Sequence, residues 1–178
     1  MKAPLPEIRR ANKADHDAIW KIFHEVVAAG DTYAIDPNIS RQDALALWFK
    51  NDAHTFVAEL DCLKQSSFET PRQVVGSYVL KHNQGGGGSH VANAAFIVAS
   101  EVRGQGIGRA MAVHCLAEAR RLGFRAIQFN FVVSTNHSAI QLWEQLGFNI
   151  VGTLPAAFQH PEKGYVDVYV VSRSLVES

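Results

Sequence analysis

The sequence has little cysteine and no excess of charge of either sign. It contains 2 cysteines in 178 residues, and its 17 basic side chains balance its 17 acidic ones. Cys62 and Cys115 have neither metal-ligand nor redox spacing, so we expect reduced thiols in a cytoplasmic protein. The charge balance gives no sign of a polyanion-binding surface, which indicates that the partner is not a nucleic acid.

Long apolar runs are missing too. The N-terminal stretch MKAPLPEIRR lacks a signal-type apolar segment, and no run is long enough to cross a membrane. None of the 8 histidines has metal-ligand spacing, so we expect no metal site. Since 47% of the residues are hydrophobic, the chain can bury one core, and we expect a single domain over residues 1–178.

What is present is a mixed pattern of apolar periods, which predicts an α/β fold with a mixed sheet. The expected strands are 7–12, 54–60, 73–82, 90–100, 126–134, 149–154 and 165–171, and the expected helices are 19–29, 41–50, 107–122 and 136–146. Ser40 with Asp43, and Asn136, are the predicted helix caps. The tract GGGGS at 85–89 is interpreted as a hairpin loop. The run 126–134 is almost wholly apolar and therefore belongs near the centre of the sheet.

The stretch VRGQGIGRAM, at 102–111, is the strongest candidate for a binding site. It places Gly104, Gly106 and Gly108 between Arg103 and Arg109, directly before a helical pattern. Glycines let the backbone approach a ligand closely, and a helix start adds unpaired N–H groups and the positive end of its dipole. The spacing fits neither the dinucleotide fingerprint nor the nucleotide P-loop. We expect a pyrophosphate here, and a plain strand–helix connection is the alternative.

Two motifs together resemble the GNAT superfamily of acetyl-CoA-dependent N-acetyltransferases. They are VRGQGIGRAM and, after an intervening strand, NHSAIQLWEQLGF. Arg103, Gly106 and Gly108 match the Arg/Gln-x-x-Gly-x-Gly/Ala motif of that superfamily. The resemblance implies a mostly antiparallel sheet of about seven strands flanked by four helices. Acetyl-CoA, the co-substrate, would lie where two central parallel strands splay apart.

The same resemblance implies three groups of cofactor contacts. Backbone groups of the strand before the glycine turn would pair with the pantetheine arm, N–H groups of the turn would hold the pyrophosphate, and the last helix would begin near the thioester. The expected residues are Phe96, Ile97, Val98, Arg103, Gly104, Gln105, Gly106, Ile107, Gly108, Arg109, Asn136 and Trp143.

A narrower resemblance bears on the acceptor. GDTYAIDP, GSHVANAAFIV and FNFVVSTN are similar to segments of the fungal proline-analogue N-acetyltransferases, which act on azetidine-2-carboxylate. Two strand asparagines bind the substrate in those proteins, and they fall on Asn93 and Asn130. Such carboxamides would orient the amine and carboxylate of a small amino acid, although either could instead be an amide satisfied by backbone. By the same resemblance, Tyr33 and Trp48 would belong to segments that roof the acceptor site; the alternative is that they are core aromatics.

Two departures from the superfamily pattern leave the proton route unassigned. Many members carry a tyrosine on the last helix, which protonates the leaving thiolate, but this sequence has Trp143 there. An indole N–H donates a hydrogen bond without releasing its proton near neutral pH. Many members also carry a glutamate on the strand before the glycine turn, whereas HVANAAFIV has no carboxylate. We therefore assign no general acid or base.

The expected activity is transfer of an acetyl group to a small-molecule amine, by direct attack in a ternary complex. Two alternatives stay open: a peptide or protein N-acetyltransferase, and a non-catalytic acyl-CoA-binding sensor. Because an exposed sheet edge often supports dimers in this superfamily, a homodimer is a further expectation.

Overall fold

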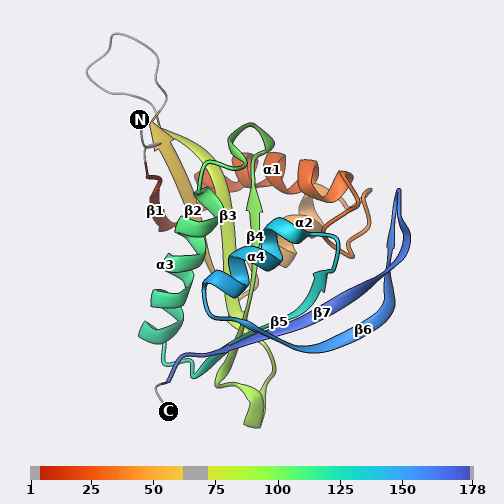
Figure 1. The fold of residues 1–178 in the computed structure, drawn as a ribbon. Helices are drawn as coiled ribbons and strands as arrows, with labels where there is room; N and C mark the ends of the chain where they lie inside the picture. The colour runs from red at the N-terminus through yellow and green to blue at the C-terminus, as the bar shows by residue number, and fades with distance from the viewer. Residues whose placement is uncertain (1–4, 62–71, 177–178) are drawn as a thin grey trace.

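A single seven-stranded sheet organises the structure, a computed structural model that describes residues 5–61 and 72–176. The strand order is β1-β2-β3-β4-β5-β7-β6, and β4 and β5 form the one parallel pair among the described strands (Figure 1). The strands are β1 (Glu7–Arg10), β2 (His54–Asp61), β3 (Arg72–His82), β4 (Val91–Val98), β5 (Ala126–Val133), β6 (Asn149–His160) and β7 (Gly164–Ser174), and the α-helices are α1 (His16–Ala28), α2 (Arg41–Trp48), α3 (Ile107–Arg121) and α4 (His137–Gln145). The predicted mixed sheet with four helices is confirmed.

The helices cover the two faces of the sheet in pairs. On one face, Met111 of α3 and Trp143 of α4 pack in a cluster with Ile127 of β5. On the other face, Phe23 of α1 joins α2 and Ile97 of β4 in a second cluster. Burial of each such side chain stabilises the fold by about 1.5–3 kcal/mol. No helix among the described residues is long and apolar enough to span a membrane.

The predicted helix caps are confirmed. The Ser40 side chain accepts a hydrogen bond from the Asp43 N–H at 3.1 Å, at the start of α2. The Asn136 Oδ1 accepts from the Ala139 N–H at 3.2 Å, at the start of α4. The glycine tract lies in the β3–β4 hairpin, as expected, and forms a short 3-10 turn at Gly86–Gly88.

The last two strands are longer than the sequence pattern predicted. They were expected at 149–154 and 165–171, but β6 continues to His160 and β7 to Ser174. The alternation breaks because β6 bulges between Leu154 and Phe158. The Ala156 N–H, inside this bulge, donates to the Asp167 carboxylate at 2.9 Å instead of to the β7 ladder. Such a bulge hides the period of two on which strand prediction depends.

The parallel pair in the middle of the sheet is very short. β4 and β5 pair only at Val91–Ala126 and Ala92–Ile127, after which the two strands separate. β5 also carries a bulge between Phe129 and Val132 in its pairing with β7. A bulge bends the strand that contains it, and this bulge lies just beyond the residue at which β5 leaves β4. The sheet therefore opens at its centre.

A tyrosine–histidine pair, in which Tyr78 is buried and His114 half-buried, fixes α3 to the sheet. The Tyr78 hydroxyl lies 2.6 Å from His114 Nδ1, and the Phe56 ring stacks on Tyr78 and meets His114 edge-on. Desolvation raises the pKa of Tyr78, so its hydroxyl stays protonated and donates to Nδ1. Desolvation also lowers the pKa of His114 below its usual 6.5, opposed by the nearby Glu118. The folded chain therefore favours the neutral form of the His114 imidazole.

This pair predicts a loss of stability in mild acid. Because the pKa of His114 is lower in the folded chain, the unfolded chain binds the proton more readily. The contribution of His114 is therefore complete above about pH 6.5 and is lost as the pH falls below it, with a slope of at most about 1.4 kcal/mol per pH unit. His114→Gln should flatten the pH dependence of the unfolding free energy, measured by urea denaturation. His24→Gln, at an exposed position on α1, is the control, and equal slopes in all three proteins would contradict the prediction.

Candidate functional site

A cleft of about 820 Å³ opens where β4 and β5 separate. Its walls are the diverging halves of these strands, the glycine turn, the starts of α3 and α4, the segment that follows α1 and the β6–β7 turn. Most of the predicted cofactor contacts line it: Phe96, Ile97, Val98, Arg103, Gly104, Gly106, Ile107, Gly108, Arg109, Asn136 and Trp143. Residues from both halves of the chain thus meet in one cavity.

The glycine turn needs glycine for its backbone conformation. Gly104 has φ +77° and Gly106, the N-cap of α3, has φ +85°, which are both left-handed values. A β-carbon at either position would meet no atom within 4 Å, so packing does not exclude a side chain there. The left-handed backbone does, because it strains any residue with a β-carbon.

The turn presents a row of N–H groups toward the cleft. The first helical N–H of α3 with a backbone acceptor is that of Ala110, which donates to the Gly106 carbonyl at 3.0 Å. The N–H groups of Ile107, Gly108 and Arg109 come before it, where an α-helix has no acceptor of its own. Together with the positive end of the helix dipole, they form a site suited to an anion.

Two arginines flank this turn, and a third cationic side chain lines the cleft. Arg103 and Arg109 are exposed and line the cleft, and Lys163 reaches it from the β6–β7 turn. Arg109 Nη1 donates to Gln145 Oε1 at 3.0 Å, which ties it to the end of α4. Gln105 differs from the other predicted contacts. It does not line the cleft, and its N–H donates to the Val102 carbonyl at 3.3 Å.

The polar backbone groups of β4 point alternately to β3 and to the cleft. The Ala99 N–H donates to the Val75 carbonyl at 2.9 Å, on the β3 side. Ile97 is two residues away and therefore also turns its backbone toward β3. Phe96 and Val98 turn theirs toward the cleft, where β5 is too far away to pair with them. Of the three predicted backbone contacts on β4, these two face the cavity.

The side chain of Tyr33 reaches the cleft-facing backbone of Phe96. Its hydroxyl donates to the Phe96 carbonyl at 2.7 Å and accepts from the Phe96 N–H at 3.0 Å. Tyr33 lies between α1 and α2 and lines the cleft together with its neighbours Asp31 and Thr32. Burial raises the pKa of Tyr33 to about 12, although the hydrogen bond from the Phe96 backbone lowers it in part. The hydroxyl is therefore protonated at neutral pH.

Aromatic side chains form the apolar floor of the cleft. The Trp143 ring lies 4.6 Å from that of Phe129 and 5.2 Å from that of Phe96, measured between ring centroids. Phe148 completes the group, at 4.9 Å from Phe129. Trp143 is 8% exposed, so its indole is mainly a packing group of this floor.

Three predicted acceptor residues lie outside the cleft lining. Trp48 is 3% exposed, and its Nε1 donates to Ser77 Oγ at 2.9 Å, which makes it a core residue. Asn93 Nδ2 donates to the Gln128 carbonyl at 2.9 Å. Asn130 Nδ2 donates to the Asn83 side chain at 2.6 Å, and its Oδ1 accepts from Gln128 Nε2 at 2.8 Å. Gln128 thus links the two asparagines, because its main-chain carbonyl accepts from Asn93 and its side chain donates to Asn130.

The cleft also contains residues that sequence reasoning missed. Phe129, Phe131 and Val132 line it from the bulged part of β5, and His160 and Glu162 line it from the β6–β7 turn. His160 Nδ1 accepts from the Glu162 N–H at 3.1 Å. Nothing in the local pattern HPEKG distinguishes this turn from a solvated loop, since its place at the cleft depends on the whole sheet.

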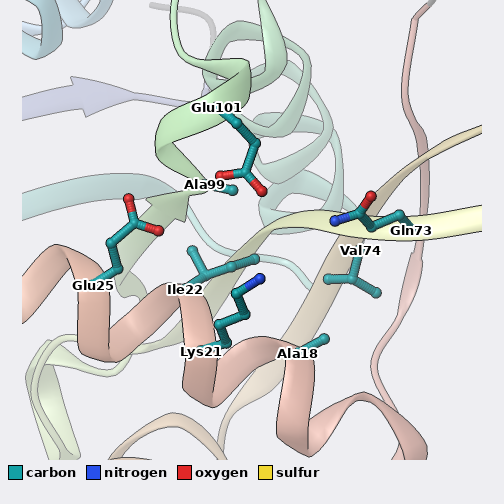
Figure 2. Close-up of a pocket in the computed structure, with 8 residues that line it drawn as sticks. All are labelled: Ala18, Lys21, Ile22, Glu25, Gln73, Val74, Ala99 and Glu101. Atoms are coloured by element: carbon teal, nitrogen blue, oxygen red, sulfur yellow. The ribbon is translucent and has the colours of Figure 1, made fainter. Parts of the chain in front are cut away.

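A second cavity lies between α1 and the end of β4 and measures about 90 Å³. Figure 2 shows Lys21, Glu25 and Glu101 around it, with Gln73 and Val74 on the opposite side. Its volume is far below that of a nucleotide or an acyl thioester, so it is not a candidate for the substrate. No group of three metal-ligating side chains occurs among residues 5–61 and 72–176.

A left-handed glycine and a helical glycine of this turn should differ in how much their substitution lowers the unfolding free energy. Gly106→Ala should lower the unfolding free energy by about 1 kcal/mol, because alanine is strained at a left-handed position. Gly108→Ala is the matched control inside α3, where an added β-carbon would approach Leu142 Cδ2 at an ordinary 3.9 Å and should cost nothing. Urea denaturation measures both, and equal losses would contradict the assignment of the strain to Gly106.

Comparison with known proteins identifies the family to which the chain belongs. Residues 16–148 match the profile of the acetyltransferase (GNAT) family. Over 151 residues the chain is 32% identical to N-acetyltransferase aca1 of Schizosaccharomyces pombe, and the alignment covers 81% of this chain and 72% of aca1. The resemblance found in the two sequence motifs is thereby confirmed at the level of the family.

Solved structures of acetyltransferases share this fold. A GCN5-related N-acetyltransferase from Kribbella flavida has 43% identity and a TM-score of 0.85, over 96% of this chain and 98% of that one. A phosphinothricin acetyltransferase from Sinorhizobium meliloti, solved in complex with acetyl-CoA, shares the fold with 21% identity and a TM-score of 0.81, over 98% of this chain and 91% of that one. The chain belongs to the GNAT family, and it is an N-acetyltransferase with acetyl-CoA as its co-substrate.

Proposed function

We propose that this N-acetyltransferase acetylates the amine of a small molecule, an amino acid or a proline-like analogue, by direct attack in a ternary complex. The observation that carries the proposal is a cluster of side-chain amides on the face of the sheet opposite α3 and α4. The cluster comprises Asn83, Asn93, Gln128 and Asn130, which come from β4, β5 and the turn after β3.

The acyl donor would approach from the other face. The N–H groups between Gly104 and Arg109, Gln105 excepted, would hold the pyrophosphate, with Arg103 and Arg109 beside it. The pantetheine arm would then run along the cleft-facing backbone of β4. An N–H of Phe96 or Val98 would polarise the thioester carbonyl, as an oxyanion donor does.

The opening between β4 and β5 would let the two substrates meet. Side chains alternate across a strand, and Ile127 and Phe129 of β5 pack on the α3–α4 side. Gln128 therefore points to the opposite face, and Asn130, which lies within the bulge, is tied to Gln128 by its side-chain hydrogen bond. Where the ladder is interrupted, an amine held on that face could reach a thioester held on the first. Direct attack needs such a passage, and a continuous ladder would close it.

The amides keep capacity for a ligand. A carboxamide can donate two hydrogen bonds and accept two. Asn130 uses one N–H and one lone pair within the cluster, so one of each is left for the carboxylate and amine of an amino acid. Asn93 Oδ1 has no hydrogen-bond partner among the described residues and could accept from the amine.

No base is assigned to this site, so the amine would react from its neutral fraction. The α-amine of a peptide has a pKa of about 8 and is roughly one-tenth neutral at pH 7, whereas the amine of a free amino acid is more basic and has a smaller neutral fraction. Burial in the site would lower the pKa of the amine and raise that fraction. The neutral nitrogen would attack the thioester carbon, the carbon–sulfur bond would break, and coenzyme A would leave as the thiolate. The amine proton would pass to solvent. Asp31 and Glu162, the carboxylates that line the cleft, are not assigned a role.

The test is release of coenzyme A from acetyl-CoA with a panel of amines. The panel holds azetidine-2-carboxylate, common amino acids, a polyamine and a short peptide. Turnover with one amino acid is expected, and Asn130→Ala should raise the KM of that amino acid by about 10- to 100-fold, since a hydrogen bond to a charged group is lost. Asn149→Ala, an exposed position on β6, is the matched control and should behave as the wild type.

The other outcomes separate the alternatives. Turnover with the peptide alone would replace the proposal by a peptide N-acetyltransferase. Binding of acetyl-CoA without turnover on any amine would favour a sensor. An Asn130→Ala protein with unchanged KM for the amino acid would move the acceptor away from the amide cluster.

A further inference from the structure

The Tyr33 hydroxyl hydrogen-bonds both the N–H and the C=O of Phe96, as an adjacent strand would in a continuous sheet. In a sheet, both the N–H and the C=O of a residue pair with the adjacent strand. Phe96 faces the cleft, beyond the point where β5 can pair with it, and Tyr33 takes both of its bonds, at 3.0 and 2.7 Å. Buried backbone groups without such a partner are costly, so this contact stabilises the open part of the sheet.

We propose that Tyr33 is an internal competitor of acetyl-CoA, and that it sets the affinity for the acyl donor. The inference rests on the proposed function, in which the acyl thioester pairs with the cleft-facing backbone of β4. One N–H of Phe96 cannot serve both the Tyr33 hydroxyl and a second acceptor in good geometry. Acetyl-CoA therefore binds at Phe96 only when the Tyr33 hydroxyl leaves it, and the binding free energy is reduced by the two bonds that break.

The position of Tyr33 makes this exchange feasible. It lies in the connection between α1 and α2, outside any helix or strand, so its side chain can leave β4 without breaking a pairing between strands. It remains protonated near neutral pH and can hydrogen-bond to water or to the acceptor after leaving. Since the same connection borders the acceptor face, the exchange also brings a hydroxyl to the side from which the amine arrives.

Tyr33→Phe gives a test in which the sign of the effect is decisive. The variant keeps the ring but loses the hydroxyl, so Phe96 loses its partner before acetyl-CoA binds and regains one afterwards. Acetyl-CoA should bind about tenfold more tightly to the variant than to the wild type, measured by isothermal titration calorimetry. A residue that contacts the acyl donor favourably would give the opposite sign. Tyr33→Leu, which also lacks the hydroxyl, should show a gain as well.

Two controls locate the effect. Tyr165→Phe removes an exposed hydroxyl from β7, outside the cleft, and should leave the affinity unchanged. In the proposed binding mode, the nucleotide half of coenzyme A, up to and including the pyrophosphate, would reach the glycine turn but not β4, so its affinity should be the same in the wild type and in Tyr33→Phe. A gain for acetyl-CoA but not for this fragment supports the competitor.

The outcomes distinguish this inference from the function on which it rests. Unchanged or weaker binding of acetyl-CoA to Tyr33→Phe, with normal binding to the wild type, overturns the inference and leaves the proposed function standing. An equal gain for the fragment also overturns it, because the effect would then not lie at Phe96. If the wild type binds no acetyl-CoA, the proposed function fails and the inference fails with it.

Discussion

The site depends on one interruption of hydrogen bonding, the end of the β4–β5 ladder after Ala92 and Ile127. Central strands normally satisfy every polar backbone group, so an opening there leaves N–H and C=O groups that need other partners. Here the Tyr33 hydroxyl is one such partner. In our proposal the acyl thioester is another. The interruption therefore provides binding groups for one substrate and a passage to the second.

The glycine turn forms a local site suited to an anion in a chain that has no net charge. With 17 basic and 17 acidic side chains, no general field attracts an anion. The attraction must be local, and the start of α3 supplies it through N–H groups and the helix dipole. Arg103 and Arg109 flank these groups. Left-handed glycines at 104 and 106 make the close approach of a ligand to the backbone possible.

Local features could be predicted from the sequence, and long-range ones could not. The caps Ser40 and Asn136 and the glycine turn depend on a few neighbouring residues, and the structure has them where the pattern indicated. The contact of Tyr33 with Phe96 joins residues 63 positions apart, and no local pattern encodes it. For the same reason, the folded sheet was required to decide between the roofing and the core position of Trp48, and to place the β6–β7 turn at the cleft.

The central claim is that acetyl-CoA binds along the cleft-facing backbone of β4 and at the glycine turn. An amide-resolved NMR titration of the whole chain with acetyl-CoA tests it most directly. We predict large shift changes at Phe96 and Val98 and at residues 106–109, and smaller ones at Ile97, whose N–H faces β3. Equal changes along all of β4, or changes confined to the second cavity beside Lys21, would contradict the account.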